Sequence, residues 1–249
     1  MPEQYDTIAE DYDWLLSDTM LSGEPQYAGL RNVLESMPPR GNILDCACGT
    51  GILASAIARH GHMIVGTDAS KGMIRVARAR AEADGLDIPF HVCTWERLPQ
   101  KWDRKFDVAV CCGNSIVHCS DSADMIRSFR GIRSVLNVGG RLVLDTRNWE
   151  KLLTEKTRYT HFDRLSRAGK SCIPIYIWNF PQKTNEPIQV DLLLPIEHEG
   201  KIDLHVHSIV CHPFTLTQLQ TCLAEAGFAV TENDHSPDRD WYCVIAGNP

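Results

Sequence analysis

Short apolar runs alternate with longer stretches of helical periodicity from residue 41 to residue 146. We expect strands near 42–46, 63–67, 89–93, 106–112 and 141–146, and helices near 51–60, 71–84 and 121–136. Ser120, Asp121 and Ser122 are candidate caps for the last helix, and Gly139-Gly140 is expected to close it. Strands that alternate with helices in this way predict an α/β fold with a parallel sheet covered by helices.

The pattern changes after this region. Between residues 155 and 213 the helical periodicity is weak, and alternating runs at 172–178, 188–192 and 204–209 are separated by Gly, Pro or charged pairs. Such alternation is typical of antiparallel strands. A last helix at 216–226 leads to strands near 228–233 and 241–246. We therefore expect a doubly wound, Rossmann-like sheet of seven strands with an inserted antiparallel sheet.

Three regions follow from these patterns. Residues 1–40 hold an amphipathic helix at 25–37 and a shorter one at 5–16, whose Tyr5, Tyr12 and Trp14 suit a lid. Residues 41–154 and 214–249 form the doubly wound core. Residues 155–213 form the inserted β region, which we expect to cover a substrate or to make an oligomer contact.

Composition and charge limit the partners. The chain has 249 residues, 43% of them hydrophobic and 23% charged, which fits one large soluble domain. Its net charge is −7, and residues 186–249 carry ten acids against Lys201 and Arg239, or −8, which leaves +1 for the rest. No region is basic enough to neutralise many phosphates, so we expect small-molecule ligands and neither nucleic acid nor membrane as a partner. The acidic first residues and the lack of a long apolar run favour a cytoplasmic protein.

Ten cysteines occur in the chain, and several lie inside apolar runs. We interpret them as reduced thiols of the core, because free cysteine is among the most buried residue types. Cys46, Cys48, Cys93, Cys111 and Cys112 fall near strand ends, which leaves a metal site open as an alternative. No C-x-x-C pair supports that alternative, and we expect no metal.

The segment 43–54 carries the most informative pattern: a strand that ends in Asp45, a turn with small residues at 47, 49 and 51, and then a helix. Small residues let a ligand approach the backbone, and the helix start offers free N–H groups. A dinucleotide turn of the G-x-G-x-x-G type is similar, but here Ala47 replaces its first glycine and no third glycine follows. A nicotinamide enzyme remains an alternative.

Asp68 lies seventeen residues after Gly51, at the end of the second strand. A carboxylate there is suited to accept both hydroxyl hydrogens of a ribose. The alternative is a cap for the helix at 71–84, since Asp-Ala-Ser before a helix is ordinary capping chemistry. We favour the ligand.

Taken together, Asp45-x-Ala-Cys-Gly-Thr-Gly51, Asp68 and Phe106-Asp-x-Ala-Val110 resemble the successive motifs of class I S-adenosylmethionine-dependent methyltransferases. Further motifs are similar to those of glycine N-methyltransferase and bacterial glycine/sarcosine N-methyltransferases; these are Asp68-Ala-Ser-x-x-Met73, Trp95, Gly113-Asn-Ser-x-x-His118 and Asp145-x-Arg-Asn148. The resemblance runs from about residue 27 to residue 148. It implies a class I methyltransferase fold and S-adenosyl-L-methionine as cofactor, with S-adenosyl-L-homocysteine as product.

The resemblance also implies a set of cofactor-binding residues. Backbone at Ala47 and Gly49 would contact the methionine part, Asp68 the ribose, and Tyr27 the cofactor's carboxylate. Met73 on one side and Thr94 with Trp95 on the other would enclose the adenine, although Met73 is equally well placed for the core. The full set is Tyr27, Asp45, Ala47, Gly49, Asp68, Ala69, Met73, Thr94, Trp95 and Cys112.

Three residues are expected to act on the substrate. The family match makes Arg147 the residue that grips an amino-acid carboxylate, and a planar guanidinium suits that bidentate task. Its alternative is a salt bridge with Asp145 or Glu150. Asn114 is expected to hold the incoming amine or its carboxylate, and His118, in the same loop, has either a direct or a structural role.

One segment departs from the family pattern. Residues 204–213 contain His205, His207, Cys211 and His212 where the family supplies tyrosines, so Tyr159 or Tyr176 is the expected substitute. We expect an N-methyltransferase that acts on a small amine bearing a carboxylate, such as glycine, sarcosine or dimethylglycine. The alternatives are an amino-sugar N,N-dimethyltransferase and a non-catalytic module that binds the cofactor, and a homo-oligomer is possible in each case.

Overall fold

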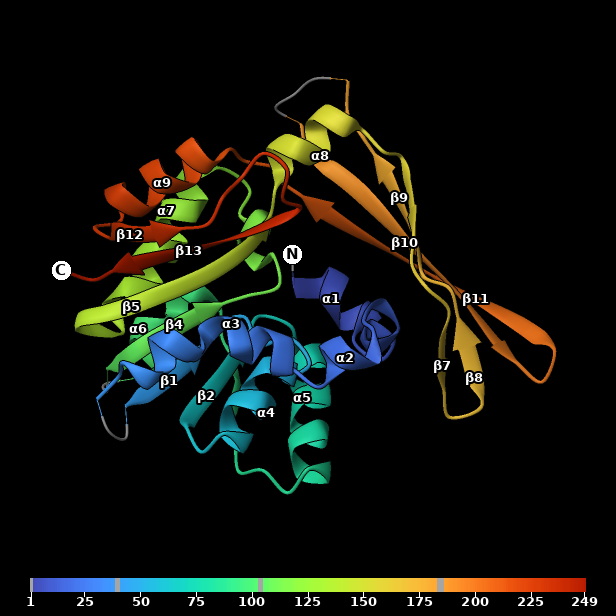
Figure 1. Cartoon of the computed structure of the whole chain (residues 1–249), viewed down its shortest axis with the longest axis horizontal. Coiled ribbons are helices and arrows are strands. Elements are labelled where there is room, and N and C mark those ends of the chain that lie inside the picture. Colours follow the sequence, from blue (N-terminus) through green and yellow to red (C-terminus); the bar gives the residue numbers. More distant parts are fainter. Residues whose placement is uncertain (1, 39–40, 103–104, 183–185) are drawn as a thin grey trace.

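A seven-stranded sheet forms the centre of the structure, a computed structural model that describes residues 2–38, 41–102, 105–182 and 186–249. The strand order is β12-β13-β5-β4-β1-β2-β3 (Figure 1). The strands are β1 (Asn42–Asp45), β2 (Met63–Asp68), β3 (Phe90–Val92), β4 (Phe106–Cys111), β5 (Leu136–Arg147), β12 (Ala229–Asn233) and β13 (Trp241–Gly247). The first five are parallel, and β13 is antiparallel to both of its neighbours. The predicted doubly wound sheet is confirmed.

Helices cover both faces of this sheet (Figure 1). One face carries α3 (Glu24–Glu35), α4 (Ile52–Arg59) and α5 (Lys71–Ala83), and the other carries α6 (Leu98–Lys101), α7 (Ser122–Ser134) and α9 (Leu216–Glu225). Successive strand residues enter different cores: Ile43 packs with the first set of helices and Leu44 with the second. Burial on both faces explains why these strands are continuous apolar runs.

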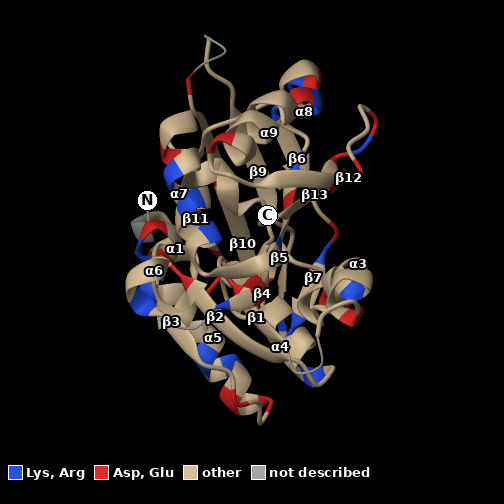
Figure 2. Cartoon of the chain, turned by 90° about the vertical axis from the view of Figure 1, so that its left-hand side faces the viewer, with Lys and Arg blue, Asp and Glu red and all other residues tan. Residues whose placement is uncertain are grey.

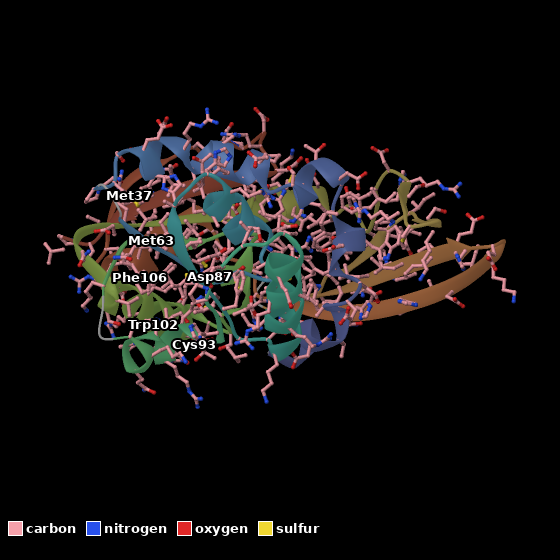
Figure 3. All side chains as sticks on the ribbon, turned by 90° about the horizontal axis from the view of Figure 1, so that it is seen from below. Met37, Met63, Asp87, Cys93, Trp102 and Phe106 are labelled. Carbon is pink, nitrogen blue, oxygen red and sulfur yellow. The ribbon has the colours of Figure 1, made fainter. Side chains whose placement is uncertain are left out.

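Aromatic side chains close the space beside β3. Trp102 lies edge-on to both His91 and Phe106, with ring centres 5.6 and 5.9 Å away, and Figure 3 labels Trp102 and Phe106 in this region. The ring of Phe106 is fully buried, so this contact seals the main core at one edge.

A second, antiparallel sheet is inserted after β5, as predicted. It contains β6 (Tyr159–His161), β7 (Leu165–Arg167), β8 (Lys170–Cys172), β9 (Ile175–Asn179), β10 (Ile188–His198) and β11 (Lys201–Cys211). β10 and β11 pair along their full lengths and extend away from the main sheet (Figure 1). The expected strand 172–178 is divided into β8 and β9 at Pro174, because proline has no N–H for a strand ladder.

Several element boundaries differ from the sequence-based expectation. The expected helix 5–16 is instead α1 (Pro2–Ile8) followed by the 3₁₀ turn η1 (Tyr12–Leu15) and α2 (Asp18–Leu21). Asp121 caps α7 as predicted, but the helix already ends at Ser134, and Gly139-Gly140 lies inside β5 at a register shift against β4. The remaining short elements are η2 (Trp95–Arg97), η3 (Ser115–His118) and α8 (Trp149–Glu155). Tertiary pairing therefore overrides the local turn signal at these glycines.

Acidic and basic residues are mixed over the face of the molecule shown in Figure 2, where both colours occur along α3, α5 and α8. Across the described ranges, every helix is too short or too polar to cross a membrane.

Candidate functional site

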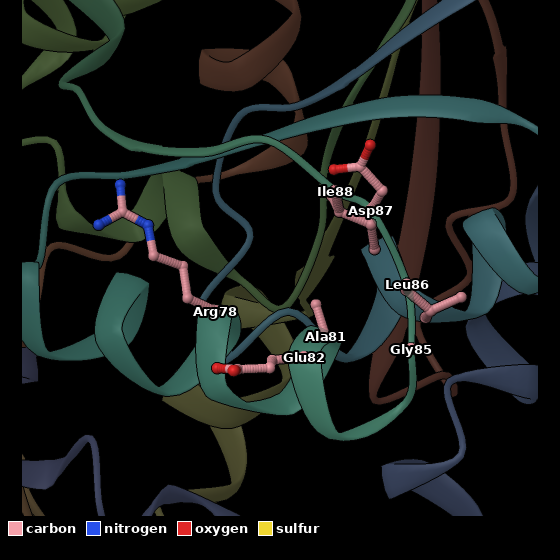
Figure 4. Close-up of a pocket in the computed structure, with 7 residues that line it drawn as sticks. All are labelled: Arg78, Ala81, Glu82, Gly85, Leu86, Asp87 and Ile88. Atoms are coloured by element: carbon pink, nitrogen blue, oxygen red, sulfur yellow. The ribbon is translucent and has the colours of Figure 1, made fainter.

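A cavity of about 920 Å³ lies at the carboxyl ends of β1, β2, β4 and β5, between the N-terminal helices and the antiparallel sheet. Ligands of doubly wound sheets bind at this edge. A second hollow of about 340 Å³ lies at the amino end of β3, between Arg78, Glu82 and Asp87 (Figure 4). It is formed by one helix and the loop after it, and no carboxyl end of a strand contributes to it. The larger cavity is therefore the candidate site.

The turn after β1 leaves its backbone open to the cavity. Asp45 is 2% exposed, and its Oδ1 accepts a hydrogen bond from the Ala47 N–H at 3.3 Å. Gly49 has φ +51°, and a Cβ there would meet nothing within 4 Å. Ala47 and Gly49 both line the cavity. A ligand can approach this backbone as the sequence predicted.

Asp68 joins the ends of β1 and β2. Its Oδ2 accepts from the Gly49 N–H and its Oδ1 from the Ser70 N–H, both at 2.9 Å. The cap of α5 is Ser70, whose hydroxyl accepts from the Met73 N–H at 3.0 Å. Helix capping is thus done by Ser70, and the remaining lone pairs of Asp68 are available to a ligand in the cavity.

A narrow part of the cavity lies between α5 and the end of β3. Met73, which is 1% exposed, lines it together with Thr94 and Trp95. The Trp95 indole is held in place because its Nε1–H donates to the Cys46 carbonyl at 2.7 Å. Ala69 and Cys112 also line the cavity, so nine of the ten predicted cofactor residues surround it.

Three carboxylates face the same cavity: Asp45, Asp68 and Asp145. Burial raises the pKa of each, that of Asp45 to about 7. Asp145 accepts from the Gly113 and Asn114 N–H groups at 2.6 and 3.2 Å. Because burying carboxylates together is unfavourable, a ligand with positive charges is stabilised here. S-adenosylmethionine, with its sulfonium and ammonium groups, fits this end of the cavity.

Arg147 occupies the end of β5 on the other side of the cavity. Its guanidinium carbon lies 5.1 Å from the ring centre of Trp178 and 4.9 Å from that of Trp241. In the part of the chain that the structure describes, no acid forms an ion pair with it. The alternative partners are engaged elsewhere: Asp145 as above, and Glu150 by the Leu216 N–H at 3.0 Å. Among the described residues, two aromatic rings flank the Arg147 cation, and Asp240 interacts with it electrostatically without forming an ion pair.

Asn114 organises this corner of the site. It has φ +65°, and its Oδ1 accepts from the Thr146 hydroxyl, the Arg147 N–H and the Trp149 Nε1–H at 2.9, 3.1 and 3.2 Å. Three donors fix the orientation of the amide and occupy its oxygen. The side-chain NH₂ of Asn114 is therefore the part that can reach a ligand.

His118 links the N-terminal segment to the antiparallel sheet. Its Nε2 lies 2.7 Å from the Tyr5 hydroxyl and its Nδ1 lies 2.9 Å from the Val210 carbonyl. Burial lowers the pKa of His118 to about 4. The ring is therefore neutral at physiological pH, with Nδ1–H donating to the carbonyl and Nε2 accepting from Tyr5. This geometry supports the structural role among the two that the sequence left open.

Other predicted residues divide between the cavity and the surface. Tyr27 packs elsewhere, contrary to the prediction: its ring stacks on His60 at 3.7 Å because the buried face of α3 packs on α4, and its neighbour Gln26 lines the cavity instead. Tyr5 and Tyr12 line the cavity, whereas Trp14 packs on Arg167. Of the two candidate tyrosines, Tyr176 lines the cavity and Tyr159 is exposed at the surface.

The histidines of β11 bind the N-terminal segment. His205 Nδ1 and His207 Nε2 each lie 2.8 Å from Oδ2 of Asp11. All ten cysteines are free thiols, and within the described ranges no group of three or more His, Cys, Asp or Glu side chains is arranged to hold a metal ion. The alternating histidines thus have a structural partner.

Sequence reasoning missed the aromatic surroundings of Arg147. Trp149, Trp178 and Trp241 all line the cavity. Trp178 alternates with outward residues on β9, a signal that marks it as inward-facing. No sequence signal indicated which arginine it would meet.

Comparisons with known proteins agree with this geometry. Residues 43–140 match the family model described as "Methyltransferase domain". The "Putative methyltransferase" of Geobacillus sp. (strain WCH70) is 25% identical over 92% of this chain and 90% of its own length. The ubiquinone biosynthesis O-methyltransferase of Ruegeria pomeroyi is 33% identical over 53% of this chain, and the match spans 46% of that enzyme.

Solved structures share the whole fold. A S-adenosylmethionine-dependent methyltransferase from Clostridium acetobutylicum superimposes with a TM-score of 0.76 and 16% identity over 98% of both chains. CalS10, an amino pentose methyltransferase from Micromonospora echinaspora, gives 0.73 and 15% identity over 92% of both chains. Residues 43–140 therefore match a methyltransferase domain, and the chain shares its overall fold with solved S-adenosylmethionine-dependent methyltransferases.

Proposed function

We propose that the protein transfers a methyl group from S-adenosylmethionine to the nitrogen of a small amine that carries a carboxylate, as in glycine, sarcosine and dimethylglycine. The observation that carries this proposal is Arg147: a cation at the cavity wall with no ion-pair partner among the described residues. A guanidinium in this setting is matched by a planar carboxylate, which it binds with two parallel hydrogen bonds.

The cofactor-facing residues have distinct roles in this proposal. Backbone at Ala47 and Gly49 holds the methionine part, Asp68 accepts the ribose hydroxyls, and Met73 and Trp95 enclose the adenine. Asp45 and Asp145 lie near the positive groups. S-adenosylmethionine, when bound, supplies a methyl group activated by a sulfonium leaving group.

Residues of the chain act on the amine by alignment. Arg147 binds the carboxylate and the NH₂ of Asn114 adds a donor beside it, so that the nitrogen is held in line with the methyl group. Apolar walls disfavour the ammonium form and thus keep the nitrogen neutral. The nitrogen uses its lone pair to form the N–C bond while the C–S bond breaks with its electrons left on sulfur. The proton of the methylated amine passes to water, which balances the reaction.

An amino-sugar N-methyltransferase is the second candidate. The fold similarity to CalS10, named as an amino pentose methyltransferase, favours it. Arg147 argues against it, because an amino sugar offers no carboxylate to a buried guanidinium. A non-catalytic module would bind the cofactor and transfer nothing.

The test is a substrate panel combined with Arg147→Lys. Wild-type protein is incubated with labelled cofactor and amino acids, N-methylated glycines or amino sugars, and products are identified by mass spectrometry. We expect transfer to carboxylate-bearing amines and a loss of about 2–5 kcal/mol in kcat/KM for Arg147→Lys, since an ammonium cannot reproduce the guanidinium fork. Cofactor affinity should be unchanged.

Arg158→Lys is the matched control, because Arg158 also stacks on an aromatic ring, 5.4 Å from Tyr159, but lies outside the cavity lining. With wild-type enzyme, replacing the substrate's carboxylate with an amide should lower kcat/KM as much as Arg147→Lys does. With the Arg147→Lys enzyme, the same replacement should lower kcat/KM little further. Full activity of Arg147→Lys, or a best substrate without a carboxylate, would contradict the proposal in favour of the sugar enzyme.

A further inference from the structure

The inner face of the antiparallel sheet forms the cavity wall beside Arg147. Trp178, Val190 and Ile209 are direct cross-strand neighbours on β9, β10 and β11, and all three line the cavity. Tyr176 and Leu192 form the next inward pair and line it too. This wall is a continuous apolar and aromatic surface.

The width of this wall follows from strand geometry. Three neighbouring strands span two interstrand spacings, or roughly 10 Å. The guanidinium of Arg147 lies at one end of this row, 5.1 Å from the Trp178 ring centre. A carboxylate bound there leaves the rest of the row to be covered by whatever else the substrate carries. Glycine has no side chain for that purpose.

Several polar groups on this side already have partners, such as Arg239 and Asp234, which form an ion pair with each other. The Tyr5 hydroxyl is engaged with His118, and the Asn114 oxygen accepts three hydrogen bonds. Among the described residues, the hydroxyls of Tyr12, Tyr176 and Tyr242 are the phenols in this lining without a hydrogen-bond partner. A sugar ring with several hydroxyls would leave most of them unpaired against such a wall, which is unfavourable.

We propose that the acceptor is an amino acid with a bulky aliphatic or aromatic side chain, which packs on the row Trp178–Val190–Ile209 while its carboxylate binds Arg147. This substrate class rests on the proposed function and narrows it. Each additional methylene buried on an apolar wall raises the specificity for a substrate by about 10-fold or more. Phenylalanine and leucine should therefore be methylated with kcat/KM at least 10-fold above that of glycine.

The experiment measures kcat/KM for glycine, alanine, leucine, phenylalanine and an amino sugar with wild-type protein and two variants. Ile209→Trp fills the wall, whereas Val206→Trp adds the same side chain to the opposite face of β11, where Val206 is 56% exposed. We expect Ile209→Trp to lower the ratio of kcat/KM for phenylalanine to kcat/KM for glycine at least 10-fold. Val206→Trp should leave both within twofold.

A binding measurement protects the test against a misfolded variant. With S-adenosylhomocysteine bound to wild-type protein, calorimetry compares phenylacetate with acetate, and phenylacetate should bind at least 10-fold more tightly. Equal affinity for phenylacetate and acetate would overturn the bulky-substrate inference alone. The same holds if glycine and phenylalanine have equal kcat/KM values and both depend on Arg147. Transfer to the amino sugar but to none of the amino acids would instead overturn the proposed function.

Discussion

Arg147 and Trp241 are direct cross-strand partners on β5 and β13, and the guanidinium carbon of Arg147 lies 4.9 Å from the centre of the Trp241 ring. β13 is the one strand that runs antiparallel to β5 in the main sheet. The stacking therefore lies where the parallel part of the sheet meets β13, at the site where a carboxylate is proposed to bind.

Replacing Trp241 with leucine should weaken substrate binding and leave cofactor binding unchanged. Stacking of this kind contributes about 0.5–2 kcal/mol, so we expect KM for the best carboxylate substrate to rise roughly 3- to 30-fold. Trp241 is 40% exposed, so the Trp241→Leu variant should keep its fold. Steady-state kinetics should show no such rise for Tyr159→Leu, whose ring stacks on Arg158 at the surface. An unchanged KM in Trp241→Leu would show that the ring does not orient Arg147.

Asp68→Asn should weaken S-adenosylmethionine binding by about 1.5–3 kcal/mol, the scale of a hydrogen bond to a charged group. The amide keeps the shape of the carboxylate, and Ser70 still caps α5. Calorimetric titration gives the affinity and circular dichroism checks the fold. Unchanged affinity in a folded variant would mean that Asp68 serves only to join the two strand ends.

The raised pKa of Asp45 predicts that stability and cofactor affinity depend oppositely on pH. Burial raises the folded-state pKa of Asp45 to about 7, above the ordinary value near 4. Its stabilising contribution in the ligand-free protein is therefore full below about pH 4 and is lost as the pH rises through about 7. Asp45→Asn should raise Tm relative to wild type at pH 8 and much less at pH 5.

A cationic cofactor favours the ionised form of Asp45, so wild-type affinity should increase from pH 5.5 to pH 8, with release of a proton on binding. Calorimetry in two buffers of different ionisation enthalpy measures that proton. Asp45→Asn should release fewer protons, since Asp68 and Asp145 are then the remaining carboxyl groups of the three that have raised pKa values in the cavity. Binding without any proton release near pH 6.5 would contradict the assignment.

Asp11→Asn should loosen the N-terminal segment from the antiparallel sheet. One carboxylate oxygen of Asp11 is hydrogen-bonded to both His205 and His207. The neutral amide oxygen of asparagine forms weaker hydrogen bonds than a carboxylate oxygen does. We expect faster hydrogen exchange in residues 5–15 and a loss of about 1–3 kcal/mol in stability. Glu10→Gln is the control, because its ion pair with Arg75 is exposed and worth little. Identical hydrogen-exchange rates in the two variants would contradict the role of Asp11 in holding the N-terminal segment to the antiparallel sheet.

The cysteines should act as core thiols. Nine of the ten have raised pKa values from burial or neighbouring groups, and Cys46 donates to the Val110 carbonyl at 3.2 Å. Purified protein should contain no stoichiometric zinc, and a chelator should leave its activity unchanged. Metal present at one equivalent and lost together with activity would overturn this interpretation.

Local pattern was sufficient for the architecture and for placing Asp45 and Asp68 at one edge of the sheet. Strands buried on both faces are apolar throughout, and helices repeat with a different period, so the order of elements can be read along the chain. Asp45 and Asp68 each end a parallel strand, and the carboxyl ends of such strands meet at one edge. Their proximity, confirmed by the Gly49–Asp68 hydrogen bond, therefore follows from topology alone.

The surroundings of Arg147 depend on the tertiary structure. Arg147, Trp178 and Trp241 belong to three strands of two sheets, and their side chains meet only because those sheets pack at a particular angle and register. The same holds for Tyr27, which lies outside the cavity lining because α3 packs on α4 and the Tyr27 ring stacks on His60. Sequence spacing encodes neighbours within an element, whereas contacts between distant segments depend on how whole elements pack, which no local period specifies.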